Sequence, residues 1–180
     1  SYAVDDPLSP PNNAAGSAIA KAAAINRESA ATGVNAVVNT NIMAGTAQSG
    51  TAAVTGRVVI NGVTSHTFST IMNNTRASRI AAVEAINRIS DITGVVAVNS
   101  NSESEGISLV AKDGRNIEVS FDTPDSAADF SARTGLREGV QAGTFSLESR
   151  VEGPIVITTS ATGNVHNAGL TVGDYTANVS

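Results

Sequence analysis

Two histidines, His66 and His166, are the side chains of this 180-residue sequence whose unperturbed charge changes near neutral pH. A histidine that acts as a general base needs a positioned partner group. His66 alternates with Phe68 in an expected strand, and His166 lies in a loop rich in Gly and Asn. We therefore expect both to be ordinary surface residues, and we assign a catalytic role to no residue.

Motifs for nucleophilic, metal and phosphate chemistry are missing from the sequence. It contains no Cys, which excludes disulfides, thiol catalysis and cysteine-ligated metals. It also has no Gly-x-Ser-x-Gly elbow, no His-Glu-x-x-His pair and no Walker loop. The sequence predicts a protein that is not an enzyme and that has no cofactor-binding or metal-binding residues.

Three weak acidic groups occur, at positions 5–6, 103–105 and 122–125. The segment 99–105 lacks the alternating ligands and terminal Glu of a calcium loop, so we expect a solvated loop there. Asp122 and Asp125 are expected at a helix start, near the positive end of its dipole. Two short segments, 73–75 and 178–180, fit the N-glycosylation pattern, which has low specificity.

Charge and hydropathy exclude two classes of partner. The formal net charge is −5 and only six residues are aromatic, which argues against a nucleic-acid surface. No apolar run approaches the ~18 residues of a transmembrane helix, so we expect no membrane partner. Residues 1–7 show neither a basic region nor an apolar stretch, so we expect no signal peptide. The chain does not begin with Met, and we expect a fragment of a longer protein.

An internal repeat organises the chain. Residues 17–37 and 78–98 are identical at thirteen of 21 aligned positions, including Ala-Ile-Asn-Arg and Thr-Gly-Val. Each copy predicts a helix followed by a strand, with Asn74 or Thr75 as N-cap of the second helix and Gly94 as its terminator. We expect the helices at 17–31 and 76–92 to pack on sheets through apolar residues at helical spacing: Ile19, Ile25, Ile80, Val83 and Ile86. The charged Arg79 is expected on another face of the second helix.

Turn signals predict most of the remaining elements. Asn61-Gly62 between 55–60 and 63–68 favours a hairpin with a type I′ turn. Lys112-Asp113-Gly114 favours a second hairpin, of 106–111 with 115–121. A short helix should follow, capped by Asp122 or Thr123, with Pro124 in its first turn, Ala127, Ala128 and Phe130 facing inward, and Gly135 as terminator. Three later strands are expected at 143–150, 154–160 and 170–179, and weak structure at 1–16, 40–53 and 160–169. The fold class is therefore α+β: β-hairpins and small sheets packed with two related helices, with a division into two subdomains left open.

The stretch 56–121 resembles the hook IN motif of bacterial flagellins. Ile60-Asn61-Gly62 and Ala85-Ile86-Asn87 carry the likeness, followed by Thr-Gly-Val-x-Ala-Val and Asp-Gly-Arg-Asn-Ile. The flanks 16–26 and 168–180 are similar to the segments on either side of the central variable region of large flagellins. The long terminal helices through which flagellins polymerise have no counterpart here, so we expect that this chain does not form filaments by itself.

The resemblance implies a division of the chain and a function. Residues 1–15 would be a linker or lead-in, 16–54 a first helix-strand unit, 55–135 the hook IN-like unit with its short helix, and 136–180 a β-rich segment returning to the flagellin core. The function implied is structural: an extracellular outer domain on the flagellar filament, contributing to surface properties, lateral contacts and antigenicity. The implied partners are other flagellin subunits, with neighbouring outer domains and surface glycans left open.

Other interpretations remain open from sequence. One alternative is an adhesive module, or a module that binds glycans or another partner, on the filament; another is the variable domain of a hook–filament junction or cap protein. An enzyme inserted into a flagellin is a further alternative, which the missing nucleophile–base and metal-ligand pairs disfavour.

Overall fold

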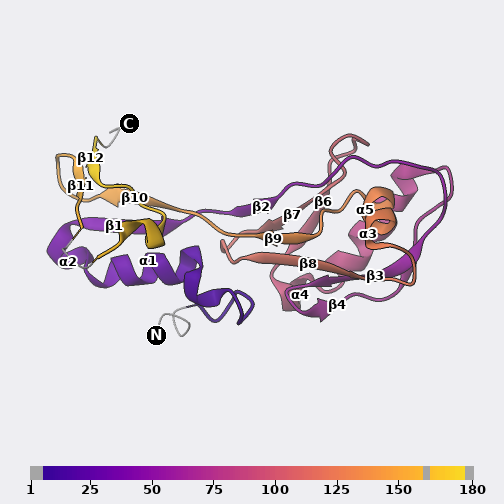
Figure 1. The fold of residues 1–180 in the computed structure, drawn as a ribbon, viewed down its shortest axis with the longest axis horizontal. Coiled ribbons are helices and arrows are strands. Elements are labelled where there is room, and N and C mark those ends of the chain that lie inside the picture. The colour runs from indigo at the N-terminus through magenta and orange to yellow at the C-terminus, as the bar shows by residue number, and fades with distance from the viewer. Residues whose placement is uncertain (1–5, 160–162, 177–180) are drawn as a thin grey trace.

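The computed structural model describes residues 6–159 and 163–176, which fold into two lobes joined end to end (Figure 1). We call residues 41–142 the central lobe, and residues 14–38 with the described part of 144–176 the terminal lobe. The chain passes between the lobes twice, just after β1 and just after β9 (Figure 1). These crossings lie side by side, because Asn39 N donates to Thr144 O at 2.9 Å. The fold is α+β, and the central lobe is inserted into the terminal lobe.

The terminal lobe contains helices against two small antiparallel ribbons. Strands β1 and β10 pair in one ribbon, and β11 and β12 in the other. Its elements are η2 (Ala14–Gly16), α1 (Ala18–Arg27), α2 (Ser29–Thr32), β1 (Val34–Val38), β10 (Phe145–Ser149), β11 (Ile155–Ile157), η3 (Val165–Ala168) and β12 (Gly173–Tyr175).

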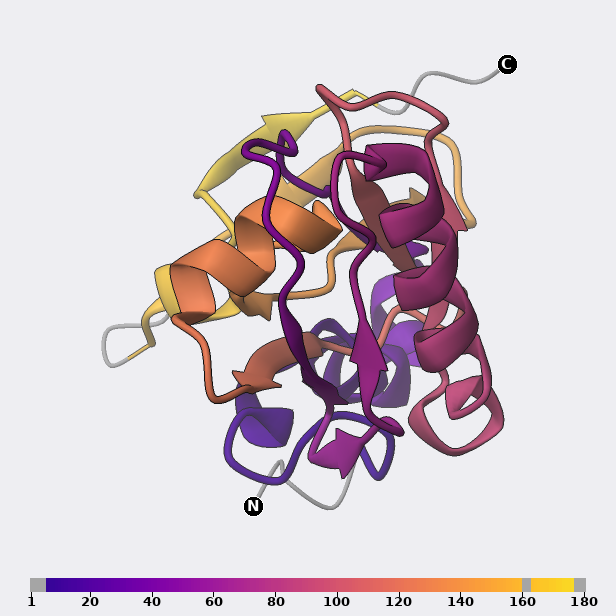
Figure 2. The same ribbon diagram turned by 90° about the vertical axis from the view of Figure 1, so that its right-hand side faces the viewer.

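The central lobe contains two antiparallel sheets, in the orders β2-β7-β6 and β4-β3-β8-β9, with β5 also paired to β3. Figure 2 looks along the long axis at this lobe and shows α3 and α5 side by side. Its elements are β2 (Asn41–Met43), β3 (Thr55–Ile60), β4 (Val63–Thr64), β5 (Phe68–Ser69), α3 (Thr75–Asn87), α4 (Ser90–Thr93), β6 (Val96–Asn99), β7 (Ile107–Ala111), β8 (Ile117–Asp122), α5 (Ala127–Thr134) and β9 (Gly139–Gln141).

The sequence repeat is one structural unit used twice. The order α1–α2–β1 in the terminal lobe matches α3–α4–β6 in the central lobe, so each expected helix is broken into a long and a short piece. Gly33 and Gly94 end the short helices with the same left-handed φ of 69°. Each repeat strand then pairs with an antiparallel partner, Ala36 facing Leu147 and Ala97 facing Leu109. The helix–strand prediction is confirmed in both copies.

The predicted helix ends are confirmed for the second copy and corrected for α5. Asn74 is the N-cap of α3, since its side chain accepts a hydrogen bond from Ala77 N at 2.9 Å. The cap of α5 is Ser126, so the predictions of Asp122 or Thr123 as cap and of Pro124 in the first turn are wrong. Ser126 is the cap because its hydroxyl accepts a hydrogen bond from the backbone N–H of Asp129, three residues further along the chain, as an N-cap side chain does. Gly135 ends the helix as predicted.

The inner face of α3 differs from the expected one. Ile86 is fully buried and Val83 is partly buried, but Ile80 is 41% exposed while Arg79 is only 3% exposed. The small side chains Ser78, Ala82 and Ala85 share the buried face with Arg79, which lets the helix approach the strands closely. The expectation that Ile80 faces the core is therefore wrong. In α1, Ile19 and Ile25 are only half-buried.

The two predicted hairpins have different outcomes. Asn61 and Gly62 have φ values of 49° and 81°, and β3 pairs with β4 across this turn, so the first hairpin is confirmed. The second is wrong: β7 pairs with β2 and β6, whereas β8 pairs with β3 and β9. The turn at 112–114 sends the chain from one sheet to the other.

One apolar core lies between the two sheets and the helices of the central lobe. Phe130 of α5 is fully buried, as expected, and its ring lies 5.4 Å from Phe68 and 5.2 Å from Phe121. Ala128, expected inside, is exposed because it lies on the opposite face of α5. Strand β2 lies in a segment expected to be weakly structured, and β9 was not expected.

The C-terminal strands are confirmed within the described residues, at β10, β11 and β12. The described part of the lead-in packs at the junction of the lobes, where Asp6 and Ser9 are buried. No helix in the described part of the chain is both long and apolar enough to span a membrane.

Candidate functional site

The residues singled out for reactive chemistry are not brought together. His66 lies exposed between β4 and β5 of the central lobe, and His166 lies exposed in η3 of the terminal lobe. Two residues of the segment 73–75, which fits the N-glycosylation pattern, have structural roles: Asn74 caps α3, and Thr75 Oγ1 donates a hydrogen bond to Glu103 Oε1. Asn73 is exposed. The sequon at 178–180 and Asp5 lie outside the described residues.

The acidic groups serve local structure. In the 99–105 loop, Asn99 Oδ1 accepts from Arg79 Nε at 3.0 Å. Asp122 pairs with Arg57 at 3.2 Å, and Asp125 accepts from Thr55 N at 3.1 Å. The expectation of two helix-start charges is wrong, because α5 begins only at Ala127. Across residues 6–159 and 163–176, no three His, Asp or Glu side chains are grouped as a metal site requires.

The repeated Ile-Asn dipeptides form the most specific polar arrangement in the structure. Asn26 Nδ2 donates to Ala36 O at 2.9 Å, and its Oδ1 accepts from Ala36 N at 2.7 Å. Asn87 binds Ala97 in the same way, at 3.1 and 2.8 Å. Each amide pairs with the outer edge of the repeat strand as a neighbouring strand would, which satisfies one donor and one acceptor and ties helix to strand. We call this arrangement an asparagine clamp.

The third Ile-Asn dipeptide clamps a different strand. Asn61 Nδ2 donates to Asn116 O at 3.1 Å, and its Oδ1 accepts from Glu118 N at 2.8 Å. Asn61 N also donates to Glu118 O at 2.9 Å. The side chain thus continues the β3–β8 pairing beyond the end of β3. The left-handed φ of Asn61 is one that Asn tolerates, so the residue suits both the turn and the clamp.

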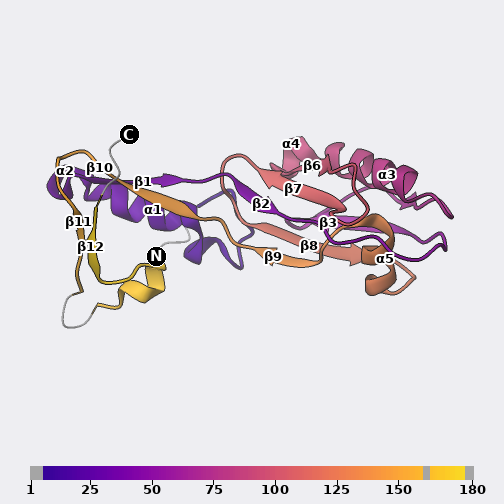
Figure 3. The same cartoon turned by 90° about the horizontal axis from the view of Figure 1, so that it is seen from above.

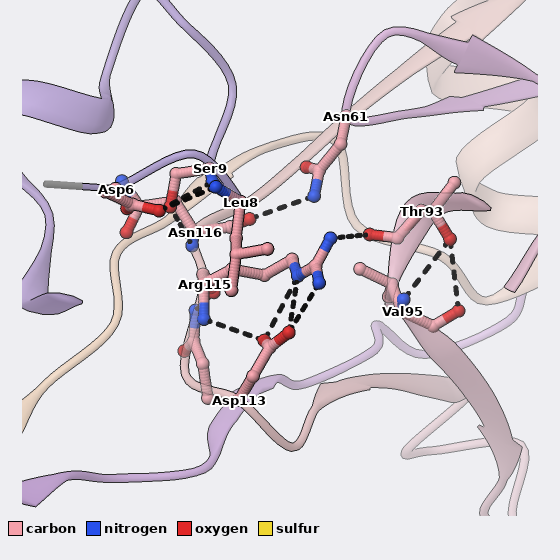
Figure 4. Close-up of polar contacts among 10 residues, drawn as sticks. Asp6, Leu8, Ser9, Asn61, Thr93, Val95, Asp113, Arg115 and Asn116 are labelled. Carbon is pink, nitrogen blue, oxygen red and sulfur yellow. Dashed lines mark hydrogen bonds and ion pairs between the residues drawn. The ribbon is translucent and has the colours of Figure 1, made fainter. Parts of the chain in front are cut away.

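Asn116 connects this clamp to the lobe junction (Figure 4). Its main-chain N donates to Ser9 Oγ at 2.9 Å, and its side-chain Nδ2 donates to Asn13 Oδ1 at 3.0 Å. Gly143 N donates to Asn116 Oδ1 at 2.9 Å. Asn116 is 3% exposed, and these bonds join the lead-in, the start of β8 and the return crossing at one residue. A second buried amide, Asn41, donates to Arg115 O and Gln141 O.

An ion pair lies beside this junction. Arg115 Nη2 contacts Asp113 Oδ2 at 2.5 Å, and Arg115 Nη1 donates to Thr93 O at 2.9 Å (Figure 4). The guanidinium therefore lies at the C-terminal end of α4, where the dipole favours a cation. Burial alone would raise the pKa of Asp113, but the hydrogen bonds and charge of Arg115 outweigh it and hold the pKa below its usual value.

Asp6 anchors the lead-in on the other side of the junction. Its Oδ1 accepts from Leu8 N and Ser9 N, both at 2.9 Å. Burial acts to raise the pKa of this carboxyl, but the hydroxyls of Ser17 and Ser9 and the two N–H groups lower it further than burial raises it. Asp6 therefore stays charged at neutral pH and fixes the chain just before η2.

Sequence reasoning did not predict the clamps or the junction. Asparagine is mostly exposed in proteins, whereas Asn41 and Asn116 are buried here. The available signal was the recurrence of Ile-Asn at three places, each followed by Gly or Arg. Amides of this kind hold backbone groups and have no acid–base chemistry near neutral pH. No protein-family model and no curated protein matches the sequence.

Proposed function

We propose that this chain is a structural outer module of a flagellar filament subunit, displayed on the surface outside the cell. The observation that carries the proposal is the asparagine clamp at all three Ile-Asn dipeptides. Asn61 and Asn87, which carry the resemblance to the hook IN motif, hold strands in place, and their side-chain amides are hydrogen-bonded to backbone groups. This use of the motif supports a structural role over a catalytic one.

The topology also supports display on a larger subunit. The central lobe is continuous in the chain, which enters and leaves it at two crossings that lie within hydrogen-bonding distance at Asn39 and Thr144. A lobe attached in this way can vary in sequence without disturbing what lies beyond the terminal lobe. The low proportion of charged residues, 15%, suits a polar surface built from Ser, Thr and Asn.

Removing the central lobe in the bacterium that encodes the chain tests this proposal. We expect a subunit whose residue 39 is joined to residue 144 by a short Gly-Ser linker to assemble into filaments that are thinner in electron micrographs. Antibodies against the central lobe should label intact wild-type filaments along their length and fail to label the shortened ones. Absence of label on wild-type filaments would contradict the proposal.

A binding function is favoured by one observation. Ile71 and Met72, in the turn before α3, are 48% and 63% exposed. This turn lies at the end of the molecule away from the terminal lobe (Figure 3). Apolar residues presented there suit an adhesive tip. Retention of the chain on glycan arrays or apolar surfaces, lost in the double variant Ile71→Ser, Met72→Ser, would support this alternative.

A further inference from the structure

The terminal lobe has no large apolar core of its own. Every member of the buried hydrophobic cluster belongs to the central lobe, from Met43 to Leu136. The buried apolar side chains described in the terminal lobe are those of Ala14, Ala18, Ala20, Ala22, Ala36 and Ile155. Alanines bury little apolar area, so this lobe gains little free energy from burial.

The repeat provides a matched comparison within one molecule. Ala36 pairs with Leu147 as Ala97 pairs with Leu109, so the two leucines occupy equivalent places. Leu109 is 1% exposed, whereas Leu147 is only half-buried. On the helices, Ile86 is fully buried, but its counterpart Ile25 is half-buried. The same unit is covered in the central lobe and partly open in the terminal lobe.

The difference is a second layer. In the central lobe the β3–β8 pair contributes Val58, Ile60 and Val119 to the core, and α5 adds Phe130. The corresponding layer in the terminal lobe is the β11–β12 arm, which Figure 3 shows extending away from α1. A hollow of about 500 Å³ lies between this arm and β10, lined by Phe145, Leu147, Ile155, Ile157, Leu170 and Tyr175.

A second hollow, of about 480 Å³, lies beside α1 and η3. Its lining includes Ala20, Ala24, Ile25 and Ala168. The first hollow includes Gly169 and Leu170, so one short stretch of chain borders both. The two hollows together leave apolar side chains of α1 and β10 without a covering layer; we call this uncovered face the open side of the terminal lobe.

The same lobe also carries apolar side chains on its outside. On and beside the arm, Val156 is 60% exposed and Val172 is 51% exposed. The arm has only two described strands, paired with each other, and a ribbon of this size is marginal without further packing. Charged residues of the lobe are nearly balanced, with Lys21, Arg27 and Arg150 against Glu28, Glu148, Glu152 and Asp174. Two copies of this lobe would therefore repel each other little.

We propose that the terminal lobe is a self-association surface, and that its missing layer is supplied by the terminal lobe of a second copy of this chain. The arm of each copy packs into the open side of the other, in the role that the β3–β8 pair has in the central lobe. Each terminal lobe has both a hollow and an apolar ribbon. In a two-fold arrangement the ribbon of each copy therefore fills the hollow of the other. The inference does not depend on membership of a filament.

Sedimentation equilibrium from about 1 µM to about 1 mM chain tests the proposal. We expect a reversible monomer–dimer equilibrium. Val156→Lys should weaken it by about tenfold or more, because the substitution places a charge at an apolar contact. This variant keeps the arm, since residue 156 faces Asp174 in the ribbon and a lysine there meets an opposite charge. Val172→Lys should act in the same direction.

Val98→Lys is the matched control, because Val98 is 47% exposed on β6 of the central lobe and should leave the equilibrium unchanged. Hydrogen exchange gives an independent measurement: amides of α1 and β10 should gain protection as concentration rises. A chain that is monomeric at every concentration would overturn the proposal, and binding of an apolar dye to that monomer would point to a different occupant. A dimer weakened by Val98→Lys and not by the arm variants would also overturn it.

Discussion

Replacing Asn87 with Ala removes both bonds that the clamp makes to Ala97. Ala97 is 4% exposed, so water cannot readily replace the lost partners of its N–H and C=O groups. We expect the free energy of unfolding to fall by about 1–3 kcal/mol, measured by urea denaturation at neutral pH.

Two neighbouring variants control this experiment. Arg88→Ala changes the next, exposed residue and should have an effect within about 0.5 kcal/mol. Asn87→Asp keeps an acceptor for Ala97 N but loses the donor to Ala97 O, so it should be as destabilising as Asn87→Ala or nearly so. Equal stability of Asn87→Ala and Arg88→Ala would show that the clamp contributes nothing.

The ion pair of Asp113 predicts a dependence on acid. In the folded state its pKa lies below the usual value, because the hydrogen bonds and charge of Arg115 outweigh the effect of burial. The stabilisation is therefore complete above the unfolded value and is lost as pH falls through the lower folded pKa. Asp113→Asn should reduce stability at pH 7 and flatten its decline in acid, whereas Asp91→Asn, on the exposed surface of α4, should follow the wild type. Denaturant melts at neutral pH and in acid measure both effects.

Single residues show where sequence reasoning reached its limit. The dipeptides Ile60-Asn61 and Ile86-Asn87 were identified as a motif, yet their use as clamps depends on strands brought close by the fold. Arg79 was expected outside because it does not share the helical spacing of the apolar residues of its helix. It is accommodated because Asn99 and Gln48 accept from its guanidinium, and both partners are far from it in sequence.

The two helix-terminating glycines allow a paired test at the level of elements. Gly33→Ala and Gly94→Ala both place a Cβ at a left-handed φ of 69°, which costs about 1 kcal/mol. At Gly94 the new Cβ would also clash with the Arg115 guanidinium at Cζ, whereas at Gly33 its nearest neighbour is Val151 Cγ2 at 3.3 Å. We expect Gly94→Ala to be the more destabilising by about 1 kcal/mol or more, because Arg115 must leave Thr93 O. Similar thermal melts for the two variants would contradict this account.

The buried face of α3 gives a second paired test. Ile86→Ala should cost about 2–5 kcal/mol, because Ile86 is fully buried and its truncation leaves a cavity. Ile80→Ala changes the same residue type on the same helix at a position that is 41% exposed, and should cost well under half as much. Chemical denaturation of both variants measures the difference. Equal costs would place the buried face elsewhere.

Elements were predictable where local chemistry decides them. Asn61-Gly62 specifies its turn because both residues accept a positive φ, and the hairpin formed as expected. The turn at 112–114 has similar chemistry, but β7 before it and β8 after it belong to different sheets. Which strands pair depends on the packing of apolar faces that are far apart in the sequence. A local turn signal carries no information about that packing.

The arrangement of the whole molecule was the least accessible from sequence. The repeat predicted two related units, but the sequence did not indicate that one acquires a second layer and the other stays open. That difference comes from residues outside the repeat: β3, β8 and α5 supply large apolar side chains to the central lobe. The β11–β12 arm supplies fewer, and leaves a hollow beneath it.

Unequal cores predict unequal stability of the lobes. At low concentration, amides in β3, β7, β8 and α3 should exchange only on global unfolding, because these elements enclose the buried cluster. Amides in β1, β10 and β11 should exchange about tenfold faster or more, through local opening of a lobe whose buried side chains are mostly alanine. The clamp of Asn26 on Ala36 is not expected to offset this, since its counterpart Asn87 makes the same bonds to Ala97 in the central lobe. Hydrogen exchange read by mass spectrometry or NMR measures both sets in one sample. Uniform protection across both lobes would mean that the terminal lobe unfolds only together with the central lobe, despite its small core.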